Sequence, residues 1–374
     1  MARVAIAHNT LDFQGGADAV CLHACAALQD RHDVTLFTAS ETAPSDLAPR
    51  FGVAADVDVR SPPGATAVAR GLAAAAPWVG PQLAVRSLLV GRYVRRVAGR
   101  FDVAVSTANE FALPLPSVQY VHYPQFNGHR LEEASGGRLN RLWTRLAGLA
   151  PPERFPTTRT AGDTTLLANS TWTADAVERL YDRRPTVVHP PVDPIEDPAD
   201  WPDREDGVVV VGRLAPDKRL LDAVRIVEGV RRRGHDLHLH VVGAAPRAYR
   251  RYADRIETAA APSHVTLERD VDRSRLLALL RTHKFGLNTK PAEPFGMALA
   301  EYVAAGMVAF APASGGQREV LAGRSNRLFG SVEEAVDLLA AAATADDPPT
   351  LSRHRFASDR FRRAIREHVE RAIT

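Results

Sequence analysis

Short valine-rich runs alternate with longer segments rich in alanine, leucine and arginine, and this alternation begins twice along the chain. Such runs are typical of buried parallel strands, and the longer segments suit the helices that connect them. In the first half we expect a helix over 17–29 and strands at 4–7, 34–37, 103–106, 118–121 and 165–168. In the second half we expect helices over 220–232, 249–259, 276–281 and 295–305, with strands at 208–211, 237–242, 265–267, 285–288 and 308–310. The pattern predicts an α/β chain with two doubly wound parallel sheets.

A chain of 374 residues is long enough for two such domains, each with its own core. A proline-rich, acidic segment separates the two halves, and an alanine- and proline-rich break follows near 340–349. We therefore predict an N-terminal Rossmann-like domain, a linker, a C-terminal Rossmann-like domain and a final helix, at 1–189, 190–206, 207–350 and 351–374. A cleft is expected between the domains. The helical pattern at the end leaves open which domain that helix packs on.

The overall composition indicates a globular protein of a reducing compartment. Cys21 and Cys25, the two cysteines of the chain, are four residues apart, which predicts one face of a helix. No basic region followed by a long apolar run opens the sequence, and no uncharged stretch is long enough to span a membrane, so we expect a cytoplasmic protein. The formal net charge of +3 does not indicate a nucleic-acid partner.

Arginine is distributed unevenly, and two arginine-rich segments stand out. From Val59 to Phe101 the chain has seven arginines and no acidic residue. The segments 78–100 and 138–149 mix these cations with leucine, tyrosine and tryptophan, which suits peripheral contact with an anionic membrane at the inner face. The alternative is that both helices pack their apolar faces on the first sheet and expose their arginines. We take membrane contact as the hypothesis.

The nine residues 293–301, Glu-Pro-Phe-Gly-Met-Ala-Leu-Ala-Glu, form the most specific motif. Proline is tolerated just inside a helix start, where free N–H groups attract phosphate. We expect these groups on Phe295, Gly296 and Met297. Glu301 would lie roughly 9–12 Å beyond Glu293 along the helix axis, the distance from a diphosphate to the ribose of the same nucleotide. The alternative is an ordinary helix with solvated acids.

A second motif, Gly-Arg-Leu-Ala-Pro-Asp-Lys at 212–218, follows an expected strand at the carboxyl edge of the second sheet. Arg213 and Lys218 can hold phosphate oxygens there. Lysine occurs at three positions, Lys218, Lys284 and Lys290, in a chain that otherwise uses arginine, which favours a specific role for Lys218. Without the other motifs, both would be read as solvated loop cations.

The first half offers two further candidates. Gly15 and Gly16 lie between the first strand and the first helix, where glycine lets the backbone approach a phosphate or sugar. His122 ends an expected strand and can hydrogen-bond a sugar hydroxyl or a developing charge. A tight turn and a structural histidine are the plain alternatives. No histidine, cysteine or acid cluster has evident metal-ligand spacing, and Asp272 is expected to cap a helix, so we predict no metal site and no cofactor.

Taken in order, these motifs resemble those of the retaining GT-B glycosyltransferases, the family that includes bacterial phosphatidylinositol mannosyltransferases, sucrose synthases and glycogen synthase relatives. The likeness covers nearly the whole chain. It implies the GT-B fold and transfer of a hexose from a nucleotide sugar without a metal. It also implies roles: Gly15 and Gly16, Arg213, Lys218 and residues 295–297 at the donor diphosphate, Glu301 at the ribose, and His122 and Glu293 at the transferred sugar.

A looser likeness and one departure accompany this resemblance. Residues 120–128, Tyr-Val-His-Tyr-Pro-Gln-Phe-Asn-Gly, are similar to lipid-linked-oligosaccharide α-1,2-mannosyltransferases, which implies a lipid-linked or glycolipid acceptor. Pro190-Pro191-Val192-Asp193 stands where the family has an Asn-Gly-Val-Asp type of turn, so the hinge differs. The alternatives are a non-catalytic nucleotide-sugar or membrane-surface protein, an NAD-dependent Rossmann enzyme and a GT-B epimerase. The donor, GDP- or UDP-linked, stays open.

Overall fold

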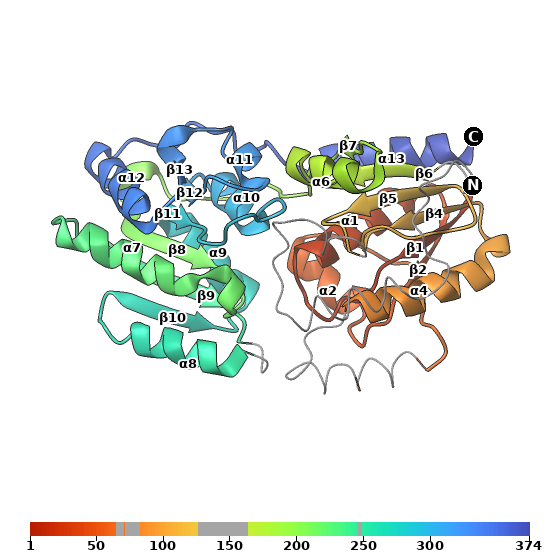
Figure 1. The fold of residues 1–374 in the computed structure, drawn as a ribbon, viewed down its shortest axis with the longest axis horizontal. Coiled ribbons are helices and arrows are strands. Elements are labelled where there is room, and N and C mark those ends of the chain that lie inside the picture. The colour runs from red at the N-terminus through yellow and green to blue at the C-terminus, as the bar shows by residue number, and fades with distance from the viewer. Residues whose placement is uncertain (65–70, 72–82, 126–163, 246–248) are drawn as a thin grey trace. The chain divides into compact units, whose positions relative to one another are not determined.

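The computed structural model describes residues 1–64, 71, 83–125, 164–245 and 249–374 (Figure 1). These residues form two compact units. The first comprises Met1–Pro191 together with Ser358–Thr374, and the second comprises Val192–Ala357. Each unit contains one parallel sheet with helices on both faces. The prediction of an α/β chain with two doubly wound parallel sheets is therefore confirmed.

The sheet of the first unit has the strand order β3-β2-β1-β4-β5-β6-β7, and each neighbouring pair is parallel. The strands are β1 (Arg3–Ala7), β2 (Asp33–Phe37), β3 (Asp58–Arg60), β4 (Val103–Ser106), β5 (Ser117–Val121), β6 (Thr164–Ala168) and β7 (Thr186–Val187). The helices described in this unit are α1 (Gly16–Leu28), α2 (Pro44–Leu47), α4 (Leu83–Val97), α6 (Thr171–Tyr181) and α13 (Ser358–Ile373). The order reverses between β1 and β4, where such sheets bind ligands.

Alternation along the strands separates two cores in this unit. Val4 and Ile6 of β1 face one core, which α1 and α13 cover. Ala5 and Ala7 face the other, which α4 covers. Both faces are apolar because helices cover both sides of a parallel sheet.

Helix α13 packs on the first unit, a point that the sequence left open. Phe361, Ile365 and Val369 recur at helical spacing and are buried in the α1 core of the first unit. The proline-rich segment predicted as a linker also contributes buried residues. Val192 and Ile195 are buried in the second unit, and the N–H of Ile195 donates to the Ala304 carbonyl at 3.1 Å. This segment packs on the second unit.

The sheet of the second unit has the order β10-β9-β8-β11-β12-β13, again parallel. The strands are β8 (Glu205–Val211), β9 (His238–Gly243), β10 (Val265–Arg269), β11 (His283–Leu287), β12 (Val308–Pro312) and β13 (Leu328–Phe329). The helices are α7 (Leu220–Arg232), α8 (Arg250–Ala259), α9 (Arg273–Thr282), α10 (Met297–Ala304), α11 (Gln317–Val320) and α12 (Val332–Ala345). One face packs on α7, α8 and α12, and the other on α9 and α10.

Two local predictions in this unit have clear outcomes. Asp272 caps α9 as expected, since its Oδ1 accepts from the N–H of Arg275 at 2.8 Å. The break was expected to begin near residue 340, but α12 continues to Ala345, so the predicted start is too early. Ser331 caps that helix, and alanine favours helix more than other residues do. Within the described ranges, no helix combines the length and apolar character needed to cross a membrane.

Candidate active site

Loops after β8, β11 and β12 meet at the carboxyl edge of the second sheet. The Thr289 hydroxyl, after β11, donates to the Lys218 carbonyl at 2.8 Å, which ties that loop to the one after β8. The N–H of Ala292 donates to the Ser314 hydroxyl at 3.0 Å, which ties it to the loop after β12. Ligands of doubly wound sheets bind at this edge. The three loops therefore form one continuous candidate site.

Two lysines share one carboxylate at the centre of this site. Lys218 Nζ lies 3.0 Å from Glu293 Oε2, and Lys290 Nζ lies 3.5 Å from the same oxygen. Lys290 Nζ is also 3.5 Å from Asp217. The motifs did not indicate Lys290, although it is one of three lysines in the chain. The structure thus joins Lys218 to Glu293, which lies 75 residues away.

The electrostatics of this cluster keep Glu293 ionised. Burial favours the neutral acid, but the charges of Lys218 and Lys290 outweigh it and lower the pKa of Glu293 below its usual value. Arg213 stands at the rim, 43% exposed and 3.7 Å from Asp217. Three cations beside two acids leave a positive excess at this edge, which suits an anionic ligand.

The glycines after β12 hold the Glu293 backbone in place. Gly315 has φ = +77°, and a Cβ added there would lie 2.4 Å from the Glu293 carbonyl oxygen. The N–H of Gly316 donates to that same carbonyl at 2.9 Å. A larger residue at Gly315 would displace Glu293, because the left-handed conformation and the close approach both require glycine.

Helix α10 begins later than predicted. Its first residue is Met297, and Gly296 precedes it with φ = +104°. Pro294 and Phe295 lie before the helix, and the Phe295 ring is buried against Phe356. The expectation of free helical N–H groups on Phe295 and Gly296 is wrong, because the left-handed turn at Gly296 delays the start. Free N–H groups at the helix start begin with Met297.

Glu301 lies about one helical turn beyond Met297, or about 6 Å along the axis. Its Oε1 accepts from Arg273 Nη1 at 2.6 Å. Arg273 is the first residue of α9, and no motif indicated it. The pair is partly exposed, so this carboxylate keeps lone pairs for further donors such as hydroxyl groups.

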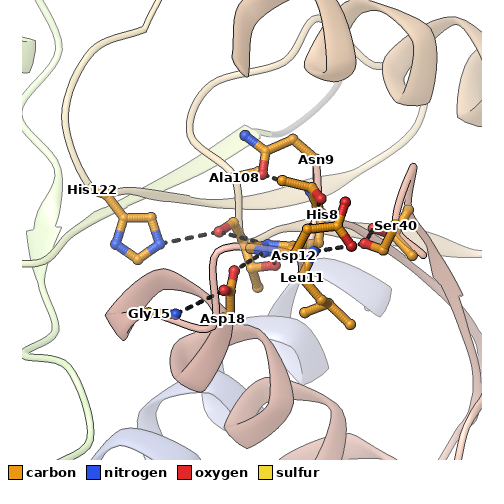
Figure 2. Close-up of polar contacts among 12 residues, drawn as sticks. His8, Asn9, Leu11, Asp12, Gly15, Asp18, Ser40, Ala108 and His122 are labelled. Atoms are coloured by element: carbon orange, nitrogen blue, oxygen red, sulfur yellow. Dashed lines mark hydrogen bonds and ion pairs between the residues drawn. The ribbon is translucent and has the colours of Figure 1, made fainter. Parts of the chain in front are cut away.

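The glycine loop of the first unit has a buried ion pair behind it. The N–H of Gly15 donates to Asp18 Oδ2 at 2.9 Å, and Asp18 Oδ1 lies 3.0 Å from His8 Nε2 (Figure 2). Asp18 therefore takes the Gly15 N–H that was expected to meet a donor phosphate. Gly16 is the first residue of α1, and the N–H of Asp18 in the first turn donates to the Gly15 carbonyl at 3.1 Å. Sequence reasoning missed His8 and Asp18.

His122 follows β5 and is held by backbone contacts of the same unit. Its Nε2 lies 3.1 Å from the Thr107 carbonyl, so Nε2 carries the proton and Nδ1 remains an acceptor (Figure 2). The N–H of His122 donates to Asn109 Oδ1 at 2.8 Å. Burial lowers the pKa of His122 to about 4, and the charge of nearby His8 adds to the effect. The ring is thus a neutral group near pH 7.

Helix α4 contradicts part of the membrane hypothesis. Arg86 is buried and lies 2.8 Å from Asp12 Oδ2, so it anchors the glycine loop and is not a surface cation. Tyr93 and Val97, within the segment expected to contact lipid, pack against the core under α4. Arg92 is exposed as expected. Residues 78–82 and the whole segment 138–149 lie outside the described residues.

Two comparisons of the sequence with known proteins find glycosyltransferases. Residues 193–356 match the family model "Glycosyl transferases group 1". A curated relative from Eremothecium gossypii, "GDP-Man:Man(3)GlcNAc(2)-PP-Dol alpha-1,2-mannosyltransferase", is 26% identical over 220 residues. That match covers 54% of this chain and 38% of the relative, so this chain spans well under half of the relative's length.

Solved structures share the architecture at low sequence identity. HepE of Anabaena, solved with UDP and glucose, has a TM-score of 0.64 at 14% identity, covering 99% of this chain and 100% of that chain. Sucrose-phosphate synthase of Thermosynechococcus elongatus gives 0.63 at 13%, covering 100% and 96%. WaaG, a glycosyltransferase of lipopolysaccharide biosynthesis, gives 0.63 at 15%, covering 99% and 95%. At such identities the likeness establishes the fold.

Proposed function

We propose that this chain transfers a hexose from a nucleoside diphosphate sugar with retention of configuration. Its residues 193–356 match the group 1 glycosyltransferase model, and it shares the fold of solved glycosyltransferases. The observation that carries the proposal is the cluster of Lys218, Lys290 and Glu293 at the carboxyl edge of the second sheet. It combines cations for a diphosphate with an ionised acid for sugar hydroxyls.

Each residue takes a role that its surroundings support. Arg213, Lys218 and Lys290 hold the diphosphate and stabilise the charge that develops on it as the glycosidic bond breaks. The first N–H groups of α10 add to this effect. Glu293, ionised and fixed by the loop after β12, orients the hydroxyls of the transferred sugar. His122, neutral and with Nδ1 as its unprotonated nitrogen, can accept a hydrogen bond from a sugar hydroxyl.

Glu301 provides the test of donor binding. We expect Glu301→Ala to raise the Kd for UDP or GDP, whichever binds, by about 10–100-fold, because a charged acceptor of the ribose hydroxyls is lost. Turnover at saturating donor should change by only a few-fold. Calorimetric titration of each nucleotide, followed by hydrolysis of its hexose conjugates, measures both quantities.

The control for this experiment is Glu257→Ala, which removes an exposed acid of α8 that pairs with Arg269. It should leave nucleotide affinity unchanged. Equal affinities for Glu301→Ala and wild type would refute the ribose assignment. Binding of neither nucleotide would refute the proposed function itself.

Metal independence is a separate expectation. With Arg213, Lys218 and Lys290 supplying positive charge at the diphosphate, transfer should need no divalent ion there. We expect the initial rate at 25 °C to stay within a factor of about two after dialysis against EDTA. A rate that is lost on chelation and restored by Mn²⁺ would contradict this role for the three side chains.

The acceptor is proposed to be a lipid-linked glycan or glycolipid at the cytoplasmic face of a membrane. Support comes from the dolichol-linked substrate in the name of the Eremothecium gossypii relative and from the local likeness at residues 120–128. Product analysis separates the alternatives. A transferase joins the hexose to an added acceptor, an epimerase releases free sugar without one, and a binding protein leaves the donor intact.

A further inference from the structure

Three histidines cluster in the second unit, at the amino ends of β9 and β11, which flank β8 in the sheet (Figure 1). His238 and His240 belong to β9, and His283 begins β11. Each offers a ring nitrogen, and these nitrogens all lie within 4.8 Å of one another. His238 Nε2 and His283 Nε2 are 3.0 Å apart. Three imidazoles gathered in this way form a set of nitrogen ligands.

The strand between β9 and β11 leaves room for these rings. Gly207 of β8 lies between them, and a Cβ added there would be 2.4 Å from His238 Nε2 and 2.5 Å from His283 Cδ2. The pairing of β8 with β11 also shifts register between His283 and Phe285. Such irregularities re-aim side chains, and here His283 points to the face that His238 and His240 share.

Hydrogen bonds fix which nitrogens face the centre of the cluster. His283 Nδ1 lies 2.9 Å from the Leu279 carbonyl and therefore carries the proton. His240 Nδ1 lies 3.2 Å from Glu268 Oε1 and donates to it. In both rings Nε2 is left as the unprotonated nitrogen. A carbonyl or carboxylate behind the ring is the usual second partner of a metal-binding histidine.

A carboxylate at the start of β8 can complete the set. Glu205 Oε2 lies 3.5 Å from His238 Nε2 and 4.0 Å from His283 Nε2. The hydrogen bonds behind His240 and His283 leave an unprotonated Nε2 on each of these rings. Neutral imidazole is the form that binds a metal ion.

We propose that His238, His240, His283 and Glu205 bind one divalent transition-metal ion, with Zn²⁺ as the preferred ion. Three imidazole nitrogens and one carboxylate oxygen suit tetrahedral zinc. The site joins β8, β9 and β11 at their amino ends. β11 runs from His283 to Leu287, and five residue steps lead from His283 to Asn288. At about 3.3 Å per step the ion lies about 17 Å from the donor-binding edge, so it stabilises the fold without entering the chemistry.

The decisive experiment compares the full chain with His238→Ala, which removes a half-exposed ligand, and with His354→Ala, which removes an exposed histidine of the same unit. After dialysis against EDTA, each protein is titrated with Zn²⁺ and, separately, with Co²⁺. Wild type and His354→Ala should bind one ion per chain, show the absorption bands of tetrahedral Co²⁺ and gain melting temperature. His238→Ala should bind at least about 100-fold more weakly.

A second variant tests the hydrogen bond behind the ligand. Glu268→Gln keeps the shape of the side chain but weakens its bond to His240, and should reduce Zn²⁺ affinity about 10-fold. Equal affinity of His238→Ala and wild type, more than one equivalent of weak binding, or octahedral Co²⁺ spectra would overturn the site. The outcome is independent of the proposed function, because the initial rate of transfer is measured separately.

Discussion

Replacement of Glu293 by glutamine is expected to lower kcat by about 10²–10³-fold, with a much smaller change in the Kd for the donor nucleotide. Glutamine keeps the size and shape of the side chain but loses the charge that holds Lys218 at 3.0 Å and Lys290 at 3.5 Å. Both the orientation of the sugar and the position of the two cations then change. Steady-state rates at saturating donor and acceptor measure the effect.

Glu257→Gln is the matched control, since it makes the same chemical change at an exposed ion pair on α8. It should retain wild-type kcat. Thermal unfolding of both variants separates a chemical effect from a loss of folded protein. A wild-type kcat for Glu293→Gln would remove this residue from the reacting centre, and the same loss in the control would show that the assay reports stability.

The fold was readable from the sequence because hydrophobic periodicity determines strand and helix in a doubly wound chain. Leu220–Arg232 was predicted as a helix and is α7 with those bounds. Val103–Ser106 likewise matches β4. Short runs that are apolar at every position are typical of strands covered on both faces, and their alternation with helical segments predicts parallel sheets. The helix predicted at 276–281 began too late because Asp272, a capping residue, starts α9 three residues earlier.

The motifs of the candidate site could be identified in the sequence, but the contacts between their residues could not be predicted from it. The pairing of Lys290 with Glu293 depends on how the loop after β11 turns back, and no local pattern encodes that turn. The start of α10 was misplaced because Gly296 takes a left-handed conformation, a possibility that the proline rule ignores. The histidine cluster was missed because its members lie on two strands. The His-Leu-His spacing at 238–240 was its visible signal.

The membrane hypothesis failed at Arg86 for a related reason. A run of arginines without acids reads as an exposed cationic face, but Asp12 lies 74 residues earlier and comes beside Arg86 only in the folded chain. Burial of a guanidinium requires such a partner together with further acceptors, here the Thr10 hydroxyl and the Ala39 carbonyl, each at 2.9 Å. Charge patterning alone does not distinguish these two situations.

Asp18→Ala is expected to destabilise the first unit by about 3–5 kcal/mol, because it leaves a buried charge without its partner. Asp18 accepts from the N–H of Gly15 in the glycine loop and from His8 Nε2 (Figure 2). On the opposite side of the His8 ring, Nδ1 lies 3.0 Å from the Thr107 hydroxyl. Urea denaturation at pH 6 measures the change. The double variant with His8→Ala should lose less than Asp18→Ala alone, since removal of both partners leaves no buried charge.

The same pair predicts how stability depends on pH. Burial opposes the charged form of His8, but Cys21 and the Asp18 carboxylate raise its pKa from 6.5 to about 10. A pKa raised in the folded state means that the folded chain binds the extra proton more tightly than the unfolded chain does. The stabilisation is therefore complete below pH 6.5 and is lost as the pH rises through about 10. Wild type should lose stability between these pH values relative to Asp18→Ala, in which the carboxylate is absent. Parallel pH profiles for the two proteins would show that His8 is neutral in the folded chain.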